Sequence, residues 1–240
     1  MNDLFQSLSK TKEMDYSAKD IEVLEGLEPV RRRPGMYIGG TDQQAMHHLV
    51  AEVLDNSMDE AVAGHANRIE LHLTKDQSVI ITDNGRGIPV DAHPKFKNKS
   101  ALEVILTTLH AGGKFSDKVY STSGGLHGVG ISVVNALSDN LNVEIARDQR
   151  LFSQQFKQGV ACSGLIDQGP VRNRRGTKIC FHPDPEIFGK NPKFKPSTLY
   201  QMAKSKAYLF RGVEIRWSCD TELIASDPKT PDAEIIHYPN

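Results

Sequence analysis

A glycine-rich segment between residues 111 and 130 restricts what this chain can fold into more than any other feature. It contains six glycines, namely Gly112, Gly113, Gly124, Gly125, Gly128 and Gly130. Ordinary helices and strands do not tolerate this density, because glycine loses more conformational entropy on folding than any other residue. The segment is therefore predicted to be a loop, and the apolar run after it predicts a helix over residues 131–137.

A glycine-rich loop in front of a helix is typical of a nucleotide site. Backbone amides without side chains can close on phosphate oxygens, and the helix N-terminus adds a favourable partial charge. Two common phosphate-binding motifs are excluded. Phe115 follows Gly112-Gly113-Lys114, so there is no Walker motif, and G-x-G-x-x-G is absent. A flexible surface loop explains the same glycines equally well.

The clearest helix is predicted between Asp42 and Ala63. Its apolar residues recur at helical spacing, at Met46, Leu49, Val50, Val53, Leu54, Met58 and Ala61. This spacing places all of them on one side of the helix, which is therefore expected to pack against the core.

An acidic stripe follows the other side of this helix, because Glu52, Asp55, Asn56 and Asp59 are spaced i, i+3, i+4 and i+7. A carboxylate near a γ-phosphate can orient and deprotonate water, and an amide one turn later can bind Mg²⁺. Glu52 and Asn56 have this spacing. A solvated helix face is the alternative interpretation of the stripe.

A β-hairpin is predicted next, because residues 69–73 alternate in polarity and an apolar run returns at 79–81 after a polar turn. The second strand ends at Asp83, followed by N-G-R-G-I-P. A carboxylate at a strand end can accept a hydrogen bond from an exocyclic amine, and Gly87 lets a flat base approach the main chain. An ordinary Asn-Gly turn is the alternative.

Local signals predict the remaining elements. Ser100 and Glu103 form a capping box that begins a helix running to about His110. A short helix is expected in the apolar stretch around Ile21 to Leu27, before R-R-R-P-G. Its three arginines are interpreted as favourable charges at a helix end, with a basic surface patch as the alternative. Further strands are predicted over residues 141–146, 151–156, 177–181 and 213–217, with a helix over 197–209.

Composition excludes several classes of protein. Lys and Arg number 29 against 30 Asp and Glu, so overall charge does not indicate a protein that coats nucleic acid. Apolar runs are short and the mean hydropathy is −0.42, which argues against membrane and secretory proteins. Cys162, Cys180 and Cys219 lack the spacing of a disulfide framework or zinc site. A cytoplasmic location is expected.

Four motifs, taken in order, resemble the ATPase domain of the GHKL superfamily. They are E-V-L-D-N (52–56), D-N-G-R-G-I-P (83–89), G-G-L-H-G-V-G (124–130) and R-R-G-T (174–177). Longer stretches at 31–39, 47–60, 109–115 and 123–138 resemble the B-type subunits of bacterial type IIA topoisomerases, and the resemblance extends from about Tyr16 to the carboxyl end. Among these subunits, the stretches 26–35 and 112–120 favour the topoisomerase IV type over the gyrase type.

The resemblance implies an α/β (α+β) fold, a two-layer sandwich in which helices cover one face of a mixed, mainly antiparallel sheet. Residues 1–20 would be a flexible arm exchanged between subunits, and residues 21–240 the ATPase domain. The transducer and cleavage domains of the family are absent from this sequence, so a longer subunit is expected.

The resemblance also implies a role for each matching residue. Glu52 would be the general base, Asn56 would hold Mg²⁺, and Asp83 would bind the adenine amine with help from water and Thr177. His48 would orient Glu52, or else be a buried histidine with a structural partner. Arg86 would pair with Glu60 beneath the adenine. The base pocket would be lined by Gly87, Ile88 and Pro89, and the lid and phosphate cradle by Gly112, Gly113, Lys114, Tyr120, Gly125, Leu126, His127, Gly128, Val129 and Gly130.

The implied function is binding and hydrolysis of ATP, with Mg²⁺, to drive the DNA clamp of a type II topoisomerase. Expected partners are DNA, an A-type subunit, a second copy on ATP binding, and aminocoumarin-type inhibitors at Asp83, Arg86, Pro89 and Arg147. Gyrase is the nearest alternative. A sensor histidine kinase lacks a glutamate equivalent to Glu52, and Hsp90-like chaperones and mismatch-repair ATPases lack G-G-L-H-G-V-G and P-G-M-Y-I-G.

Overall fold

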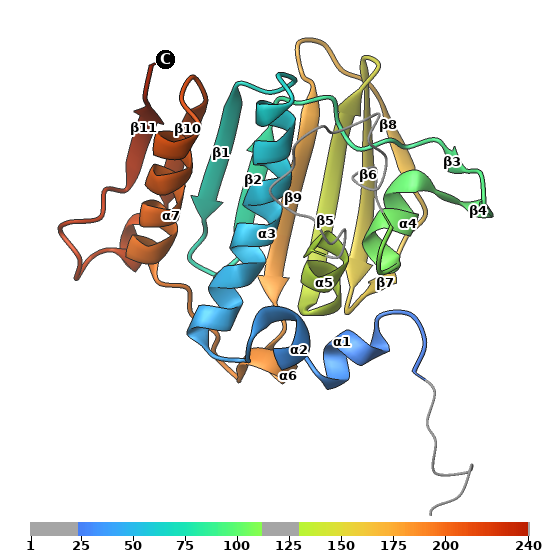
Figure 1. Cartoon of the computed structure of the whole chain (residues 1–240), viewed down its shortest axis with the longest axis horizontal. Helices are drawn as coiled ribbons and strands as arrows, with labels where there is room; N and C mark the ends of the chain where they lie inside the picture. Colours follow the sequence, from blue (N-terminus) through green and yellow to red (C-terminus); the bar gives the residue numbers. More distant parts are fainter. Residues whose placement is uncertain (1–23, 112–129, 240) are drawn as a thin grey trace, which may run out of the picture.

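The computed structural model describes residues 24–111 and 130–239. The predicted arm, residues 1–20, and nearly all of the glycine-rich segment lie outside this part of the chain. Within it, a large sheet forms one layer and helices cover one of its faces, as Figure 1 shows. The two-layer sandwich expected from the motifs is confirmed.

The sheet has nine strands. They are β1 (Arg68–Leu73), β2 (Val79–Asp83), β5 (Ser138–Arg147), β6 (Arg150–Lys157), β7 (Val160–Ala161), β8 (Ile166–Pro170), β9 (Gly176–Pro183), β10 (Glu214–Cys219) and β11 (Ala233–His237). Their order is β11-β10-β1-β2-β9-β5-β6-β7, and β8 also pairs with β6. Every pairing is antiparallel except that of β1 with β10, so the sheet is mixed and mainly antiparallel.

The predicted hairpin of β1 and β2 is present, with Leu71 opposite Ile81. Its alternation of buried and half-buried residues follows from the two-residue period of a strand with one covered face. A separate small hairpin, β3 (Ala92–His93) with β4 (Phe96–Ser100), was not predicted. Nor was β8, which has no alternating apolar pattern because most of its residues are exposed.

The helices are divided between one face of the sheet and one end of its strands. They are α1 (Glu28–Arg32), α2 (Gly35–Ile38), α3 (Gln43–Val62), α4 (Ala101–Thr107), α5 (Gly130–Ala136), α6 (Pro185–Phe188) and α7 (Pro196–Leu209), with a 3-10 turn η3 at Thr221–Leu223. In Figure 1, α3, α4, α5 and α7 lie over the sheet, and α1, α2 and α6 lie beyond the end of the strands. The longest, α3, matches the predicted amphipathic helix. It begins after Asp42, whose carboxylate accepts a hydrogen bond from the amide of Ala45 (2.8 Å).

The core lies between α3 and the middle of the sheet. Leu49, Val53 and Leu54 of α3 are fully or almost fully buried, as are Leu71 of β1 and Ile81 of β2. Ser100 caps α4 as predicted, since its hydroxyl accepts a hydrogen bond from the amide of Glu103 (3.1 Å). No helix of the described residues is both long and apolar enough to span a membrane.

The first helix of the described residues begins later than the apolar spacing predicted, and residues 21–23 of the predicted stretch lie outside the described part of the chain. α1 begins at Glu28, after Leu27, and Leu27 is itself buried as a core residue. Pro29 explains the start, because proline lacks an amide hydrogen and fits the first turn of a helix. The interpretation of the arginines as charges at a helix end is also incomplete, because Arg31 forms ion pairs with Asp184 and Glu186.

Candidate active site

Asp83, at the end of β2, is a buried carboxylate surrounded by local donors. Its Oδ2 accepts a hydrogen bond from the hydroxyl of Ser57 on α3 (3.1 Å), and its Oδ1 accepts from the amides of Gly85 (2.9 Å) and Thr177 (3.3 Å). Burial raises the pKa of Asp83 to about 6, although these hydrogen bonds act in the opposite direction. The carboxylate is therefore held in one orientation and remains mostly ionised at neutral pH.

Two glycines let the main chain close around Asp83. Gly176 has φ +115°, and a Cβ atom there would lie 2.0 Å from the carbonyl oxygen of Asp83. A Cβ atom on Gly85 would lie 2.9 Å from both Oδ1 of Asp83 and Oε2 of Glu60. No role was predicted from the sequence for Ser57, Gly85 or Gly176. Two signals were available: Gly176 lies within R-R-G-T, and Ser57 follows Asn56 directly.

The ion pair expected between Arg86 and Glu60 is present. The guanidinium contacts the carboxylate through two nitrogens, at 2.7 Å to Oε1 and 3.1 Å to Oε2, and the Arg86 amide also donates to Oε2 (2.9 Å). Glu60 is on α3 and Arg86 is in the loop after β2. This three-bond contact therefore fixes the loop to the helix.

The same loop is tied to the sheet at two further points. Thr177 of β9 accepts a hydrogen bond from the amide of Ile88 through its hydroxyl (3.3 Å). Arg147, at the end of β5, donates to the carbonyl oxygen of Gly87 (3.0 Å), where φ is +77°. Pro89 follows as an exposed residue. The structure thus brings together the residues predicted around the base, Asp83, Arg86, Gly87, Ile88, Thr177 and Arg147.

Glu52 is an exposed residue of α3 that lies against the first residue of α5. A Cβ atom on Gly130 would stand 1.9 Å from Oε2 of Glu52, so the close approach depends on glycine at that position. Asn56 is half-buried and lies one turn further along α3, on the same side as Glu52. One helix therefore carries both residues and, through Ser57, also holds Asp83.

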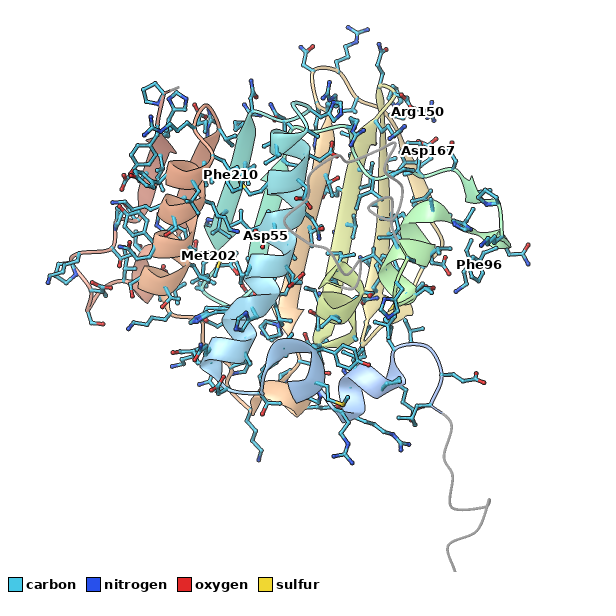
Figure 2. The ribbon with its side chains drawn as sticks, viewed as in Figure 1. Asp55, Phe96, Arg150, Asp167, Met202 and Phe210 are labelled. Atoms are coloured by element: carbon cyan, nitrogen blue, oxygen red, sulfur yellow. The ribbon has the colours of Figure 1, made fainter. Side chains whose placement is uncertain are left out.

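The acidic stripe on α3 is not one solvated face. Figure 2 shows Asp55 on the side of α3 towards α7, where it forms an ion pair with Lys206. Asp59 is 3% exposed. The alternative interpretation is therefore wrong for these two residues, because the helix rotates them towards other packed elements.

The burial of the two neighbouring histidines of α3, His47 and His48, differs from what was expected. His48 is exposed, so the interpretation of His48 as a buried structural histidine is wrong. The buried one is His47, whose Nε2 accepts a hydrogen bond from the Lys195 amide (3.1 Å) and whose ring stacks on Phe194. Burial lowers the pKa of His47, and the charges of His48 and Lys195 lower it further.

Most of the predicted phosphate cradle falls outside the described residues, and of that set only Gly130 is placed. The positions outside are Gly112, Gly113, Lys114, Tyr120, Gly125, Leu126, His127, Gly128 and Val129.

Comparison with known families defines the class of this protein. The family of histidine kinase-, DNA gyrase B- and HSP90-like ATPases matches residues 41–187, which run from the start of α3 through the centre of the sheet to α6. This range includes Glu52, Asn56, Asp83, the glycine-rich segment and Thr177. The chain belongs to this family of ATP-binding ATPases.

Sequence identity to individual relatives distinguishes between the topoisomerase IV and gyrase types within this family. The chain is 57% identical over its whole length to the B-type subunit of DNA topoisomerase 4 from Rickettsia felis, of which it covers 36%. It is 60% identical over 94% of its length to the same subunit of Caulobacter vibrioides, covering 32% of that protein. Identity to the B-type subunit of DNA gyrase from Staphylococcus aureus is 50% over 93% of the chain, covering 35%. The preference for the topoisomerase IV type is confirmed, and the chain spans about a third of the length of these relatives.

Proposed function

We propose that this chain binds and hydrolyses ATP to drive the DNA clamp of a type II topoisomerase, with decatenation as the expected reaction of the complete enzyme. The observation that carries the chemistry is that α3 presents Glu52 and Asn56 on one side and also fixes Asp83 through Ser57. The similarity in sequence to the topoisomerase 4 relatives supports the biological setting. A gyrase is the alternative, supported by the lower but substantial identity to the gyrase relative.

The adenine end of the nucleotide would be recognised at Asp83. Its carboxylate is an acceptor for the exocyclic amine, and water would complete the contact. The Thr177 hydroxyl already accepts a hydrogen bond from Ile88, which leaves its own hydrogen for a ring nitrogen of the base. The Arg86–Glu60 pair would lie beneath the ring. Aminocoumarin-type inhibitors would use the same surface, at Asp83, Arg86, Pro89 and Arg147.

At the phosphate end, the exposed carboxylate of Glu52 would accept a proton from the attacking water. His48 would orient this carboxylate. Asn56 suits a Mg²⁺ ion, because Mg²⁺ prefers oxygen ligands and is commonly held by one or two protein groups together with substrate phosphates. The bound ion would neutralise charge on the phosphates. Gly130 and the glycine-rich segment before it would surround the phosphate oxygens.

Replacement of Gly130 by alanine tests the placement of Glu52. The new methyl group would overlap the carboxylate of Glu52, which must move, whereas alanine is at least as favourable as glycine in a helix. We expect thermal stability to be kept and ATP turnover to fall roughly 10-fold, since a misplacement of about 1 Å can reduce a rate by up to roughly 10². Gly164→Ala is the matched control, because a Cβ atom there would meet no other part of the described chain within 4 Å. Equal turnover in the two variants would argue against this placement.

The biological setting is tested in the complete subunit assembled with its A-type partner. We expect DNA to stimulate ATP turnover, a second copy to be bound when ATP is present, and linked DNA circles to be separated. ATP-dependent negative supercoiling would instead identify a gyrase. ATP hydrolysis that does not respond to DNA, with no strand passage, would contradict a topoisomerase role.

A further inference from the structure

The C-terminal end of α5 is held by four different segments of the chain. The last four carbonyl groups of a helix have no partner within it, and they usually depend on caps or water. Here four consecutive carbonyl oxygens accept hydrogen bonds from outside the helix: Val134 from the Ser138 hydroxyl (2.6 Å), Asn135 from the Gly159 amide (3.1 Å), Ala136 from the Arg31 guanidinium (2.8 Å) and Leu137 from the Asp184 amide (3.0 Å).

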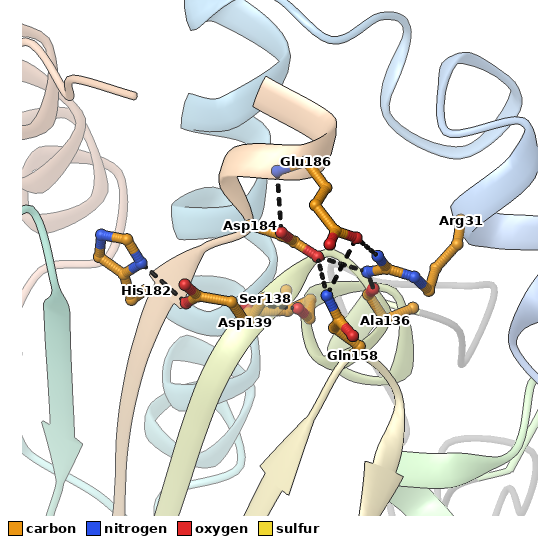
Figure 3. Close-up of polar contacts among 9 residues, drawn as sticks. Arg31, Ala136, Ser138, Asp139, Gln158, His182, Asp184 and Glu186 are labelled. Atoms are coloured by element: carbon orange, nitrogen blue, oxygen red, sulfur yellow. Dashed lines mark hydrogen bonds and ion pairs between the residues drawn. The ribbon is translucent and has the colours of Figure 1, made fainter. Parts of the chain in front are cut away.

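Arg31 is the charged donor among these four, and it comes from α1, about a hundred residues earlier in the chain. Figure 3 shows its guanidinium between Ala136 and the carboxylates of Asp184 and Glu186. The nitrogen that contacts Ala136 also contacts Oδ2 of Asp184 (2.7 Å), and the other contacts Oε2 of Glu186 (3.0 Å). A cation beside the last carbonyls of a helix is favourable, because that end carries partial negative charge.

The carboxylate of Asp184 is itself tightly held, which fixes the direction of Arg31. Its side chain is 1% exposed and accepts hydrogen bonds from the side-chain amide of Gln158 (2.8 Å) and the backbone amide of Glu186 (2.9 Å). Burial alone raises the pKa of Asp184, but these bonds and the one from Arg31 outweigh it and lower the pKa. Asp184 is therefore ionised at neutral pH and keeps the guanidinium in place.

The opposite end of α5 reaches the proposed hydrolytic site. Gly130, its first residue, lies against the carboxylate of Glu52. The helix has only seven residues, so its ends are about 10 Å apart. Asn135 also donates a side-chain hydrogen bond to the carbonyl of Leu106 (2.9 Å), which restricts rotation about the helix axis. Fixing one end of so short a helix therefore fixes where the other end meets Glu52.

We propose that Arg31 is a positioning residue for ATP hydrolysis: it anchors the C-terminal end of α5 so that Gly130 stays in register with Glu52. The inference rests on the proposed hydrolytic role of Glu52. The contact also couples α1 to the hydrolytic site through α5, although α1 itself lies beyond the end of the strands.

The test compares Arg31→Met with Arg32→Met. Arg32 lies next to it on α1 and forms an ion pair with Glu28 of the same helix (2.9 Å). Hydrogen exchange of the amides of residues 131–137 is measured in this chain, and ATP turnover and nucleotide affinity are measured in the complete subunit. We expect Arg31→Met alone to accelerate exchange in α5 and to lower kcat roughly 10-fold. Affinity for ADP should change little in both variants, because the pocket around Asp83 is held by Ser57, Gly85 and Thr177.

Arg31→Lys keeps the proposal testable if the methionine variant fails to fold. Lysine retains the charge near Asp184, but a single ammonium group cannot reproduce the planar contacts to a carbonyl and two carboxylates. We expect intermediate exchange and intermediate kcat. Exchange and kcat in both Arg31 variants equal to those of Arg32→Met would overturn the inference while leaving the proposed function intact. A wild-type complex without ATP turnover would instead remove the proposed function itself.

Discussion

Replacement of Glu52 by alanine is expected to abolish ATP hydrolysis while nucleotide still binds. The proposed base acts on water, whereas affinity is expected from the pocket around Asp83, so the two effects separate. Loss of a general base typically lowers a rate by about 10² to 10⁴. Because Glu52 is exposed, its removal leaves no buried cavity and the domain should keep its stability. Single-turnover hydrolysis in the complete enzyme and calorimetry with a non-hydrolysable ATP analogue measure the two effects.

Asp55→Ala is a matched control for this experiment. Asp55 is three residues further along α3 and forms an ion pair with Lys206 of α7, whereas Glu52 lies against Gly130 of α5. Removing one partner of a partly exposed ion pair changes stability by only about 0.2 to 1 kcal/mol. The control should therefore hydrolyse ATP at the wild-type rate. Near wild-type turnover in Glu52→Ala would contradict the assignment of Glu52 as the base.

Replacement of Asp83 by asparagine is expected to weaken nucleotide binding. One carboxylate oxygen becomes an NH₂ group, which would face the adenine amine with a donor in place of an acceptor. A hydrogen bond to a charged group contributes about 1.5 to 3 kcal/mol, which corresponds to a fall in affinity of roughly 10- to 150-fold. Calorimetry with a non-hydrolysable analogue measures it, and aminocoumarin binding should fall in parallel. Unchanged affinity would exclude Asp83 from the adenine contact.

The same substitution, Asp83→Asn, should stabilise the nucleotide-free domain at neutral pH, although it weakens nucleotide binding. The folded pKa of Asp83, about 6, is raised above its ordinary value of 3.8. The raised pKa of Asp83 therefore stabilises the folded state at low pH. This contribution to the free energy of unfolding is fully present below pH 3.8 and is lost as the pH rises through 6. Each pKa unit corresponds to about 1.4 kcal/mol, so the loss in the wild type is about 3 kcal/mol.

Asparagine cannot ionise, so Asp83→Asn should escape this loss. Urea unfolding at several values between about pH 4 and 7 should show the free energy of unfolding of the variant rising relative to the wild type as the pH increases. A constant difference across this range would show that burial of Asp83 does not impose the expected penalty. A rising difference together with weaker binding would mean that the domain keeps a destabilising charge for the sake of its ligand.

The sequence by itself determined the elements whose signals are local. The spacing of apolar residues located α3, alternation located the hairpin of β1 and β2, and the capping residue located the start of α4. Each depends on contacts within a few positions, which a linear pattern records directly. The ordered motifs identified the family, and with it Glu52, Asn56 and Asp83 as the candidate site residues.

Only the tertiary structure decided which side chains complete that site, because their partners are far apart in the chain. Asp83 is held by Ser57 and Thr177, 26 and 94 positions away, and Arg31 reaches Asp184 across 153 positions. The same holds for His47, which is buried because the loop between α6 and α7 packs against it, while the adjacent His48 remains exposed. His47 and His48 are the same residue type at adjacent positions of one helix, so the sequence around them does not distinguish the two. Only the elements packed around the helix determine which of them is buried and which is left at the surface.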